Sequence, residues 1–109
     1  MIQLRISEAA ALAIVEQADY YQQAPDVSLA DRWGVAVDEA TRTLLSWPER
    51  GAPCRFRSSA LANLRWINVP GFPRHMIFYR YLSDEQIVLI IHVLHGARNL
   101  ETLLSRDQD

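Results

Sequence analysis

The segment from Gln86 to His95 constrains the fold of this chain more than any other. Apolar side chains fill both alternating sets of positions, with Ile87, Leu89, Ile91 and Val93 on one set and Val88, Ile90 and Leu94 on the other. In an extended chain these two sets point to opposite faces. A strand that is apolar on both faces has to be covered on both. The segment therefore predicts a central strand of a sheet with chain packed, at least in part, against each side.

The first half of the chain predicts a strand followed by two helices. Residues 2–6 alternate between apolar and polar, as in a half-buried strand. Ser7 occupies an N-cap position, and a helix is predicted to follow it up to residue 23, where Ala24-Pro25-Asp26 breaks the pattern. The apolar stripe of this helix consists of Ala11, Ile14, Ala18 and Tyr21, widened by Leu12 and Val15.

A second helix is predicted from Ser28, where Ser28 and Asp31 resemble a capping box with Asp in place of Glu. Its apolar residues are spaced alternately by four and three positions, which is the seam of a helix packed on one side. The seam residues are Trp33, Val37, Ala40, Leu44 and Trp47. Both tryptophans are therefore predicted to lie in the core, and the two helices to form an antiparallel hairpin.

The second half predicts strands. Residues 49–62 are polar and irregular and read as a surface loop, and strands are predicted for residues 64–69, 75–82 and 86–95. Turns are expected at residues 70–73 and 83–85. Residues 99–105 are expected to form either a short helix or a tail that docks on a partner. The order is strand, helix, helix, strand, strand, strand. The predicted class is α+β, with a helical hairpin packed on a small, mostly antiparallel sheet.

The length of 109 residues fits a single domain, residues 1–109, with residues 99–109 as a probable tail. Half of the residues are apolar and 22% are charged, which excludes a disordered chain. The apolar segments are too short to span a membrane, and the first residues lack the pattern of an export signal. Cys54 is the only cysteine, so no disulfide can form within the chain. We expect a cytoplasmic protein.

Charge is divided unevenly along the chain. Residues 1–49 carry eight acids and three arginines, whereas residues 50–98 carry seven arginines and two acids. All eleven basic residues are arginine. Two interpretations are equally favoured: the basic half binds an acidic or polyanionic partner, or the two halves pair with each other.

The usual catalytic signatures are absent, since the sequence has no glycine-rich phosphate loop and no metalloprotease or serine hydrolase motif. His92 and His95 are three residues apart, so on a strand they point to opposite faces and cannot bind one metal ion together. We predict neither a metal site nor a cofactor. His95 beside Arg98 could act as an acid or base, although a structural role at the strand end is favoured. Arg80 needs a partner, either as a rim residue or in an ion pair. Cys54, next to Arg55 and Arg57, is an incidental thiol or one with a lowered pKa.

Three segments carry a resemblance to a known family. Residues 72–81 (FPRHMIFYRY) hold a proline followed, after five residues, by Tyr-Arg, and residues 93–98 (VLHGAR) end the apolar strand in a V-x-H-x-A-R pattern. Residues 44–51 (LLSWPERG) end the second helix with leucines, a proline and a glycine. Taken in their order along the chain, the motifs resemble the ParE branch of the RelE/ParE toxins of bacterial toxin–antitoxin modules. This branch includes plasmid stabilisation toxins. The resemblance covers residues 2–98.

The resemblance implies a cytosolic toxin neutralised by an antitoxin that wraps a small, acidic, largely helical C-terminal segment around it. The residues expected to bind the antitoxin or the target are Arg55, Arg57, Arg65, Arg74, Arg80, Arg98 and Trp66. Charge complementarity would orient docking and apolar groove residues would supply affinity. ParE-like toxins poison DNA gyrase by trapping its cleaved complex with DNA. The resemblance thus implies a binding protein with no chemistry of its own.

The alternative implied by the same superfamily is a RelE-like, ribosome-dependent mRNA endonuclease. Such enzymes use lysines before the sheet, an arginine early in the third strand, an arginine after the last strand and a C-terminal tyrosine. Here no lysine exists, Met76 and Leu104 occupy the expected arginine and tyrosine positions, and only Arg98 matches. A different catalytic set would draw on His75, His95 and Arg98. A third possibility is an inactive relative that only binds an antitoxin.

Overall fold

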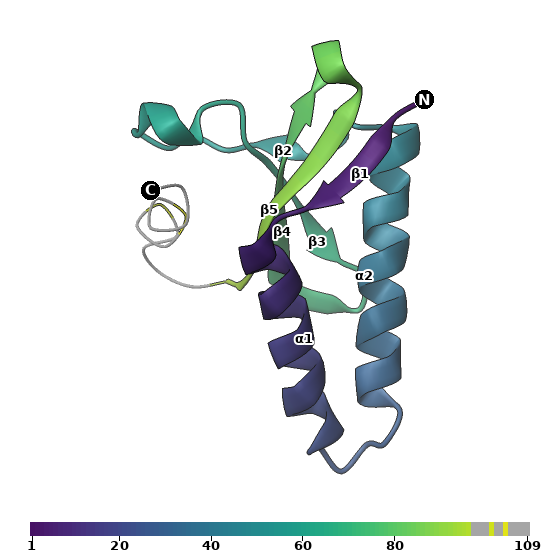
Figure 1. The fold of residues 1–109 in the computed structure, drawn as a ribbon. Helices are drawn as coiled ribbons and strands as arrows, with labels where there is room; N and C mark the ends of the chain where they lie inside the picture. The colour runs from purple at the N-terminus through teal and green to yellow at the C-terminus, as the bar shows by residue number, and fades with distance from the viewer. Residues whose placement is uncertain (97–100, 102–103, 105–109) are drawn as a thin grey trace.

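The computed structural model describes residues 1–96, 101 and 104, which form two helices and one sheet (Figure 1). The strands are β1 (Gln3–Ile6), β2 (Ala52–Pro53), β3 (Arg65–Val69), β4 (Phe72–Leu82) and β5 (Ile87–His95), and the helices are α1 (Glu8–Gln22) and α2 (Leu29–Ser46). Short 3₁₀ turns, η1 (Ser59–Leu61) and η2 (Ser83–Glu85), complete the fold. The sheet order is β1-β5-β4-β3-β2, and only the β1–β5 pair is parallel. The predicted α+β class and element order are confirmed.

The strand β5 lies inside the sheet between β1 and β4, as its two apolar faces require. Val88, Ile90 and Val93 pack in the cluster under the helices, while Ile91 packs in a separate cluster on the opposite face. The regular alternation of β5 is interrupted at Ile91, because Phe78 of β4 pairs with His92 and Tyr79 pairs with Ile90. Ile91 is therefore an extra residue in β5, and Val93 faces the helices, as Ile90 does. Both faces of β5 are thus covered by chain.

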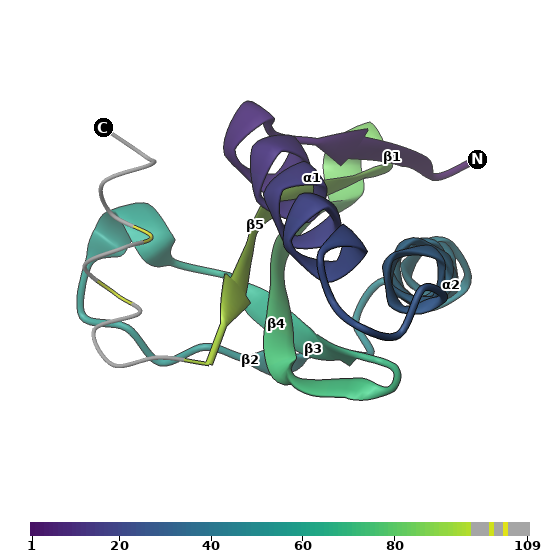
Figure 2. The same ribbon diagram turned by 90° about the horizontal axis from the view of Figure 1, so that it is seen from below.

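Both helices pack on one side of the sheet, and the chain between β2 and β3 lies away from them, across the sheet (Figure 2). Trp33 is fully buried between the helices and the sheet. Among residues 1–96, no helix is long and apolar enough to cross a membrane.

Four apolar residues predicted to lie in the helix seams are exposed instead. Ala11, Leu12 and Val15 lie on the outer side of α1, because this helix contacts the rest of the protein along the side that carries the buried Ala10. Trp47 is 65% exposed because it follows the last residue of α2 with φ −145° and ψ 76°, so the helical spacing no longer sets its direction.

Two predicted boundaries were also wrong. The turn expected over residues 70–73 is confined to Pro70 and Gly71, and β4 begins at Phe72. The predicted loop of residues 49–62 contains β2, which pairs with Arg65 and Trp66 of β3. A strand of two residues is too short to show any alternation in the sequence. The helix predicted for residues 99–105 falls mostly outside the described residues.

Ser7 joins three elements at the start of α1. Its hydroxyl oxygen accepts a hydrogen bond from the amide of Ala10 at 3.0 Å, as an N-cap does, and its hydroxyl donates to the carbonyl of Ile91 at 2.6 Å. Ser28 was predicted to play the same role for α2, but its side chain makes no capping bond. It donates to the carboxylate of Asp26 instead.

Replacing Ser7 by alanine is expected to lower the free energy of unfolding by about 1–2 kcal/mol, because both the N-cap bond and the tie to β5 are lost. Urea denaturation followed by circular dichroism measures the change. Ser28→Ala is the matched control, because this serine caps nothing, and it should change stability by less than about 0.5 kcal/mol. Equal effects of the two substitutions would contradict the assignment.

Candidate partner-binding site

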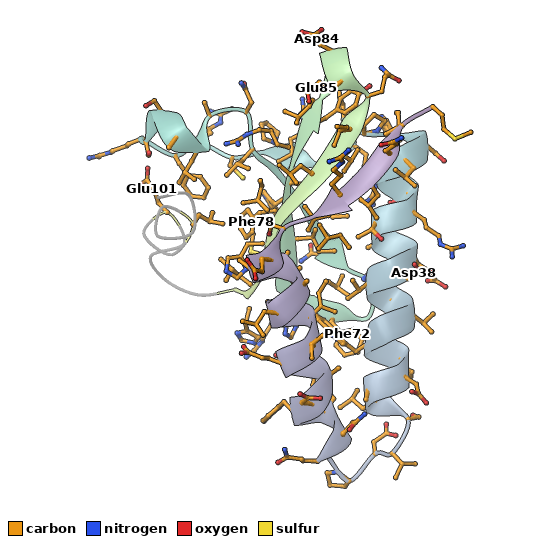
Figure 3. The ribbon with its side chains drawn as sticks, viewed as in Figure 1. Asp38, Phe72, Phe78, Asp84, Glu85 and Glu101 are labelled. Carbon is orange, nitrogen blue, oxygen red and sulfur yellow. The ribbon has the colours of Figure 1, made fainter. Side chains whose placement is uncertain are left out.

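The face of the sheet turned away from the helices carries an apolar cluster, here called the second face. Alternation along β4 sends Met76, Phe78 and Arg80 to this side, because neighbouring side chains point in opposite directions. Phe78 is labelled in Figure 3, on the side of the sheet that faces Glu101. The buried members of the cluster are Leu61, Leu64, Phe78, Ile91 and Leu104.

Part of the second face is open to solvent. Six apolar side chains packed on the cluster are only partly buried: Cys54, Phe56, Trp66, Met76, Leu89 and Leu94. Trp66 lies opposite Phe78 in the β3–β4 pair, so it shares this surface with the buried Phe78. Large aromatic side chains in such positions are frequent anchors of protein interfaces. The predicted partner-binding role of Trp66 thus falls on a residue with an exposed portion.

Among the described residues, no arginine of the second half forms an ion pair with an acid of the first. The ion pairs among the described residues are Arg32 with Asp26 and Arg42 with Asp38, and both lie within the helical hairpin. Arg55, Arg57 and Arg74 are exposed. Of the two interpretations of the charge division, the described residues therefore favour an outside partner over internal pairing.

Arg65 and Arg80 are held by main-chain carbonyls. Arg65 donates through Nη1 to the carbonyls of Glu49 at 3.1 Å and Gly51 at 2.8 Å. Arg80 donates through Nε to Ala62 at 3.2 Å and through Nη2 to Ala60 at 2.8 Å. The partner that Arg80 needed is thus a pair of backbone oxygens and not a carboxylate. Arg98 lies outside the described residues.

The two histidines predicted as acid–base candidates meet under the helices. His75 and His95 face each other across β4 and β5, with ring centroids 5.0 Å apart. His95 is exposed, but His75 is buried against Trp33, whose ring centroid is 4.7 Å away. Nε2 of His75 is buried without a hydrogen-bond partner among the described residues. Burial, and secondarily the neighbouring His95, lower the pKa of His75.

The lowered pKa of His75 makes stability depend on pH. A histidine whose pKa is lower in the folded than in the unfolded state stabilises the fold above its unfolded pKa, near 6.5, and this contribution is lost as the pH falls through the folded pKa. The free energy of unfolding is therefore expected to fall between pH 7.5 and 5.5. Urea titrations at both values measure it, and His75→Phe should flatten the dependence. An unchanged slope in that variant would assign the effect to another group.

Two further kinds of site, a reactive thiol at Cys54 and a metal site, are not supported by the described residues. Burial raises the pKa of the Cys54 thiol, which favours an incidental thiol over one with a lowered pKa. Across the part of the chain that is described, no three His, Cys, Asp or Glu side chains are placed to hold a metal ion.

Sequence patterns did not reveal two tertiary contacts, one on the helix side of the sheet and one beside the second face. The hydroxyl of Tyr79 accepts a hydrogen bond from the buried amide of Gly51 at 2.9 Å. The amide of Ser58 donates to the carboxylate of Glu101 at 2.8 Å, which ties Glu101 to the loop before β3. Each contact joins residues far apart in the chain, so only the tertiary fold brings them together.

Three solved structures that match this fold come from toxin–antitoxin systems. A chromosomal ParDE system from P. aeruginosa matches with a TM-score of 0.70 at 14% identity, over 89% of this chain and 98% of that one. A RelBE toxin–antitoxin complex from Mycobacterium tuberculosis matches with a TM-score of 0.59 at 19% identity, over 88% and 93%. The isolated E. coli RelE toxin matches with a TM-score of 0.54 at 12% identity, over 99% and 98%. These likenesses show the fold.

The sequence itself identifies the family. No curated protein matches the chain. The family described as ParE toxin of type II toxin-antitoxin system, parDE, matches residues 4–100. That span begins at the second residue of β1 and includes both helices and strands β2 to β5 in full. The chain belongs to the ParE toxin family of type II toxin–antitoxin systems.

Proposed function

We propose that this chain is a cytoplasmic bacterial toxin that inhibits DNA gyrase and is neutralised by a cognate antitoxin. The observation that carries the proposal is the match to the ParE family over residues 4–100. ParE-like toxins act by binding, so the chain needs an exposed recognition surface more than a catalytic set. The half-buried apolar residues of the second face and the unpaired arginines around them fit that need.

Three positions argue against the ribonuclease alternative. Met76, where a RelE-like enzyme would carry an arginine, packs on the apolar second face. Leu104, at the tyrosine position, is fully buried in the same cluster. His75 is only 6% exposed and lies under the helices, so an RNA 2′-hydroxyl does not reach it in this conformation. A general acid or base has to come within hydrogen-bond reach of its proton.

One observation favours a ribonuclease as the second candidate. His95 is exposed at the end of β5, and the exposed arginines Arg55 and Arg57 could hold RNA phosphates in place of lysines. These residues supply charge and one titratable group, which is less than the acid–base pair that RNA cleavage employs. The gyrase proposal is therefore preferred.

The proposed antitoxin follows from the surface and from the likeness to toxin–antitoxin complexes. An acidic, helical C-terminal segment would place apolar side chains against Trp66 and its neighbours and carboxylates against the surrounding arginines. Arg55, Arg57, Arg74 and Arg98 are the arginines proposed for this role. Arg98→Ala is expected to weaken toxicity or antitoxin binding.

The decisive experiment is induction of the chain alone in a bacterial host, followed by pulse labelling of DNA and protein synthesis, with Arg98→Ala in parallel. Gyrase inhibition predicts that DNA synthesis falls first and that cells filament. In vitro, the purified chain should then trap cleaved DNA with gyrase. An early fall in protein synthesis with cut transcripts would support the ribonuclease instead. Unaffected growth would leave an inactive, antitoxin-binding relative.

A further inference from the structure

A cavity of about 450 Å³ opens beside the outer half of β4, where β3 has not yet begun. Its lining includes two guanidinium groups, from Arg65 and Arg80, together with Tyr81, Ser83 and Glu49. None of the ion pairs among the described residues involves either arginine. The cavity thus concentrates positive charge without an internal carboxylate bound to it.

Arg65 presents an unused edge. Both hydrogens of its Nη1 go to the carbonyls of Glu49 and Gly51, so the side chain is fixed from one side. Within residues 1–96, Nε and Nη2 donate to nothing, and these two atoms form the edge with which arginine grips a carboxylate in bidentate fashion. The anchored side lowers the entropy that binding would cost.

Arg80 is arranged in the same way from the other face of the sheet. Its Nε and one hydrogen of Nη2 bind the carbonyls of Ala62 and Ala60, which leaves Nη1 and the second Nη2 hydrogen unused within the described part of the chain. Arg65 pairs with Tyr79, which lies under the helices, whereas Arg80 shares the face of Phe78. The two guanidinium groups therefore approach the cavity from opposite faces of the sheet.

The strand beside the cavity has an open edge. Arg80, Tyr81 and Leu82 pair with β5, but the pairing of β4 with β3 ends where Tyr79 meets Arg65. Figure 1 shows the β4–β5 hairpin continuing past the end of β3. Main-chain groups on such an edge are available to pair with another extended segment.

We propose that this cavity binds an extended acidic peptide segment that adds to the open edge of β4 and places two consecutive carboxylates on Arg65 and Arg80. Consecutive side chains of a strand point to opposite faces, which is the arrangement of the two guanidinium groups. A polypeptide is favoured over nucleic acid because only a polypeptide can pair with the strand edge. The inference deepens the proposed antitoxin partnership and rests on it for the source of the peptide.

The test uses the purified full chain and a fluorescein-labelled peptide with the core Val-Asp-Glu-Val, compared with the same peptide carrying Val-Asn-Gln-Val. Fluorescence polarisation should show binding of the acidic peptide and about tenfold weaker binding of the amide peptide. Arg80→Gln and Arg65→Gln should each weaken binding of the acidic peptide by about tenfold. Arg5→Gln, an equal change of charge on β1 outside the cavity, should change it by less than about twofold.

A gain-of-binding variant protects the test against loss of folding. Glu49 lines the cavity, so Glu49→Gln removes a negative charge that repels the incoming carboxylates and should tighten binding by about twofold or more. Thermal melting checks each variant, since Arg65→Gln and Arg80→Gln each lose two bonds to main-chain carbonyls. Glu49→Gln loses none of these bonds and carries the result if either arginine variant unfolds.

Several outcomes would overturn the inference. These are equal binding of the two peptides, equal loss in Arg5→Gln and Arg80→Gln, or tighter binding of a labelled single-stranded oligonucleotide with the same dependence on Arg80. Inorganic phosphate that displaces the peptide at low millimolar concentration would reduce the cavity to a simple anion site and refute the strand pairing. The assay contains neither gyrase nor antitoxin. Its failure would therefore reject this site and leave the growth and DNA-synthesis results to decide the proposed function separately.

Discussion

Replacing Trp33 by alanine is expected to lower the free energy of unfolding by about 3–5 kcal/mol, a large share of the stability of a chain this size. Trp33 is fully buried in the cluster between the helices and the sheet. Its ring meets those of Phe72 at 5.2 Å and His75 at 4.7 Å, and Phe72 is seen between α1 and α2 in Figure 3. Alanine would leave a cavity that the rigid sheet cannot close.

The indole of Trp33 also makes a hydrogen bond, whose loss adds to the effect of the cavity. Its Nε1 donates to the carbonyl of Ile14 at 3.1 Å, which fastens α2 to α1. Trp33→Phe should therefore recover part of the lost stability but not all, because the carbonyl of Ile14 then lacks this donor.

Trp47 provides the matched control for this experiment. It is the same residue type but is 65% exposed, so Trp47→Ala should change the free energy of unfolding by less than about 1 kcal/mol. Urea denaturation followed by far-ultraviolet circular dichroism avoids the change in tryptophan fluorescence. Similar losses in the two variants would mean that the core is not organised around Trp33.

Gly51→Ala is expected to cost about 2–4 kcal/mol, combining overpacking with loss of a buried hydrogen bond. An alanine Cβ at this position would lie 2.5 Å from the hydroxyl oxygen of Tyr79 and 2.9 Å from the carbonyl oxygen of Trp66. The tyrosine is itself buried and the carbonyl belongs to β3, so neither can move without disturbing the sheet. The hydrogen bond from the amide of Gly51 to Tyr79 would be broken.

Gly34→Ala is the matched control, because it makes the same change at a position with no neighbouring atom within 4 Å. Gly34 lies inside α2, where alanine is favoured over glycine by up to about 1 kcal/mol, so this variant should be more stable than the parent. Opposite signs for the two substitutions are the expected result. Destabilisation by both would show that the loss at Gly51 reflects something other than local crowding.

A double-mutant cycle would locate the crowding. Tyr79→Phe removes the hydroxyl that lies nearest to the added methyl group, at the cost of leaving the amide of Gly51 unpaired. In the Gly51→Ala background this cost has largely been incurred already, so Tyr79→Phe should be much less harmful there than alone. Additive effects would rule out direct contact between the two groups.

Local patterns in the sequence determined the class and order of the elements. The two apolar faces of residues 86–95 required an internal strand, and Trp33 was placed in the core by its helical spacing with Val37 and Ala40. These predictions succeeded because side-chain periodicity and burial are set by neighbours a few residues away in the chain. The family motifs, which also lie in short segments, identified the ParE family in the same way.

Only the tertiary structure decided which residues of each apolar pattern are buried and which groups far apart in sequence are in contact. Trp47 continues the helical spacing but lies beyond the last turn of α2, so it is exposed. The contact between His75 and His95 depends on the register of β4 with β5. The hydrogen bonds of Arg65 and Arg80 to main-chain carbonyls depend on where the chain before β3 lies against the sheet. Such contacts join residues far apart in sequence. Their geometry follows from strand register and packing, which no local spacing of residue types encodes.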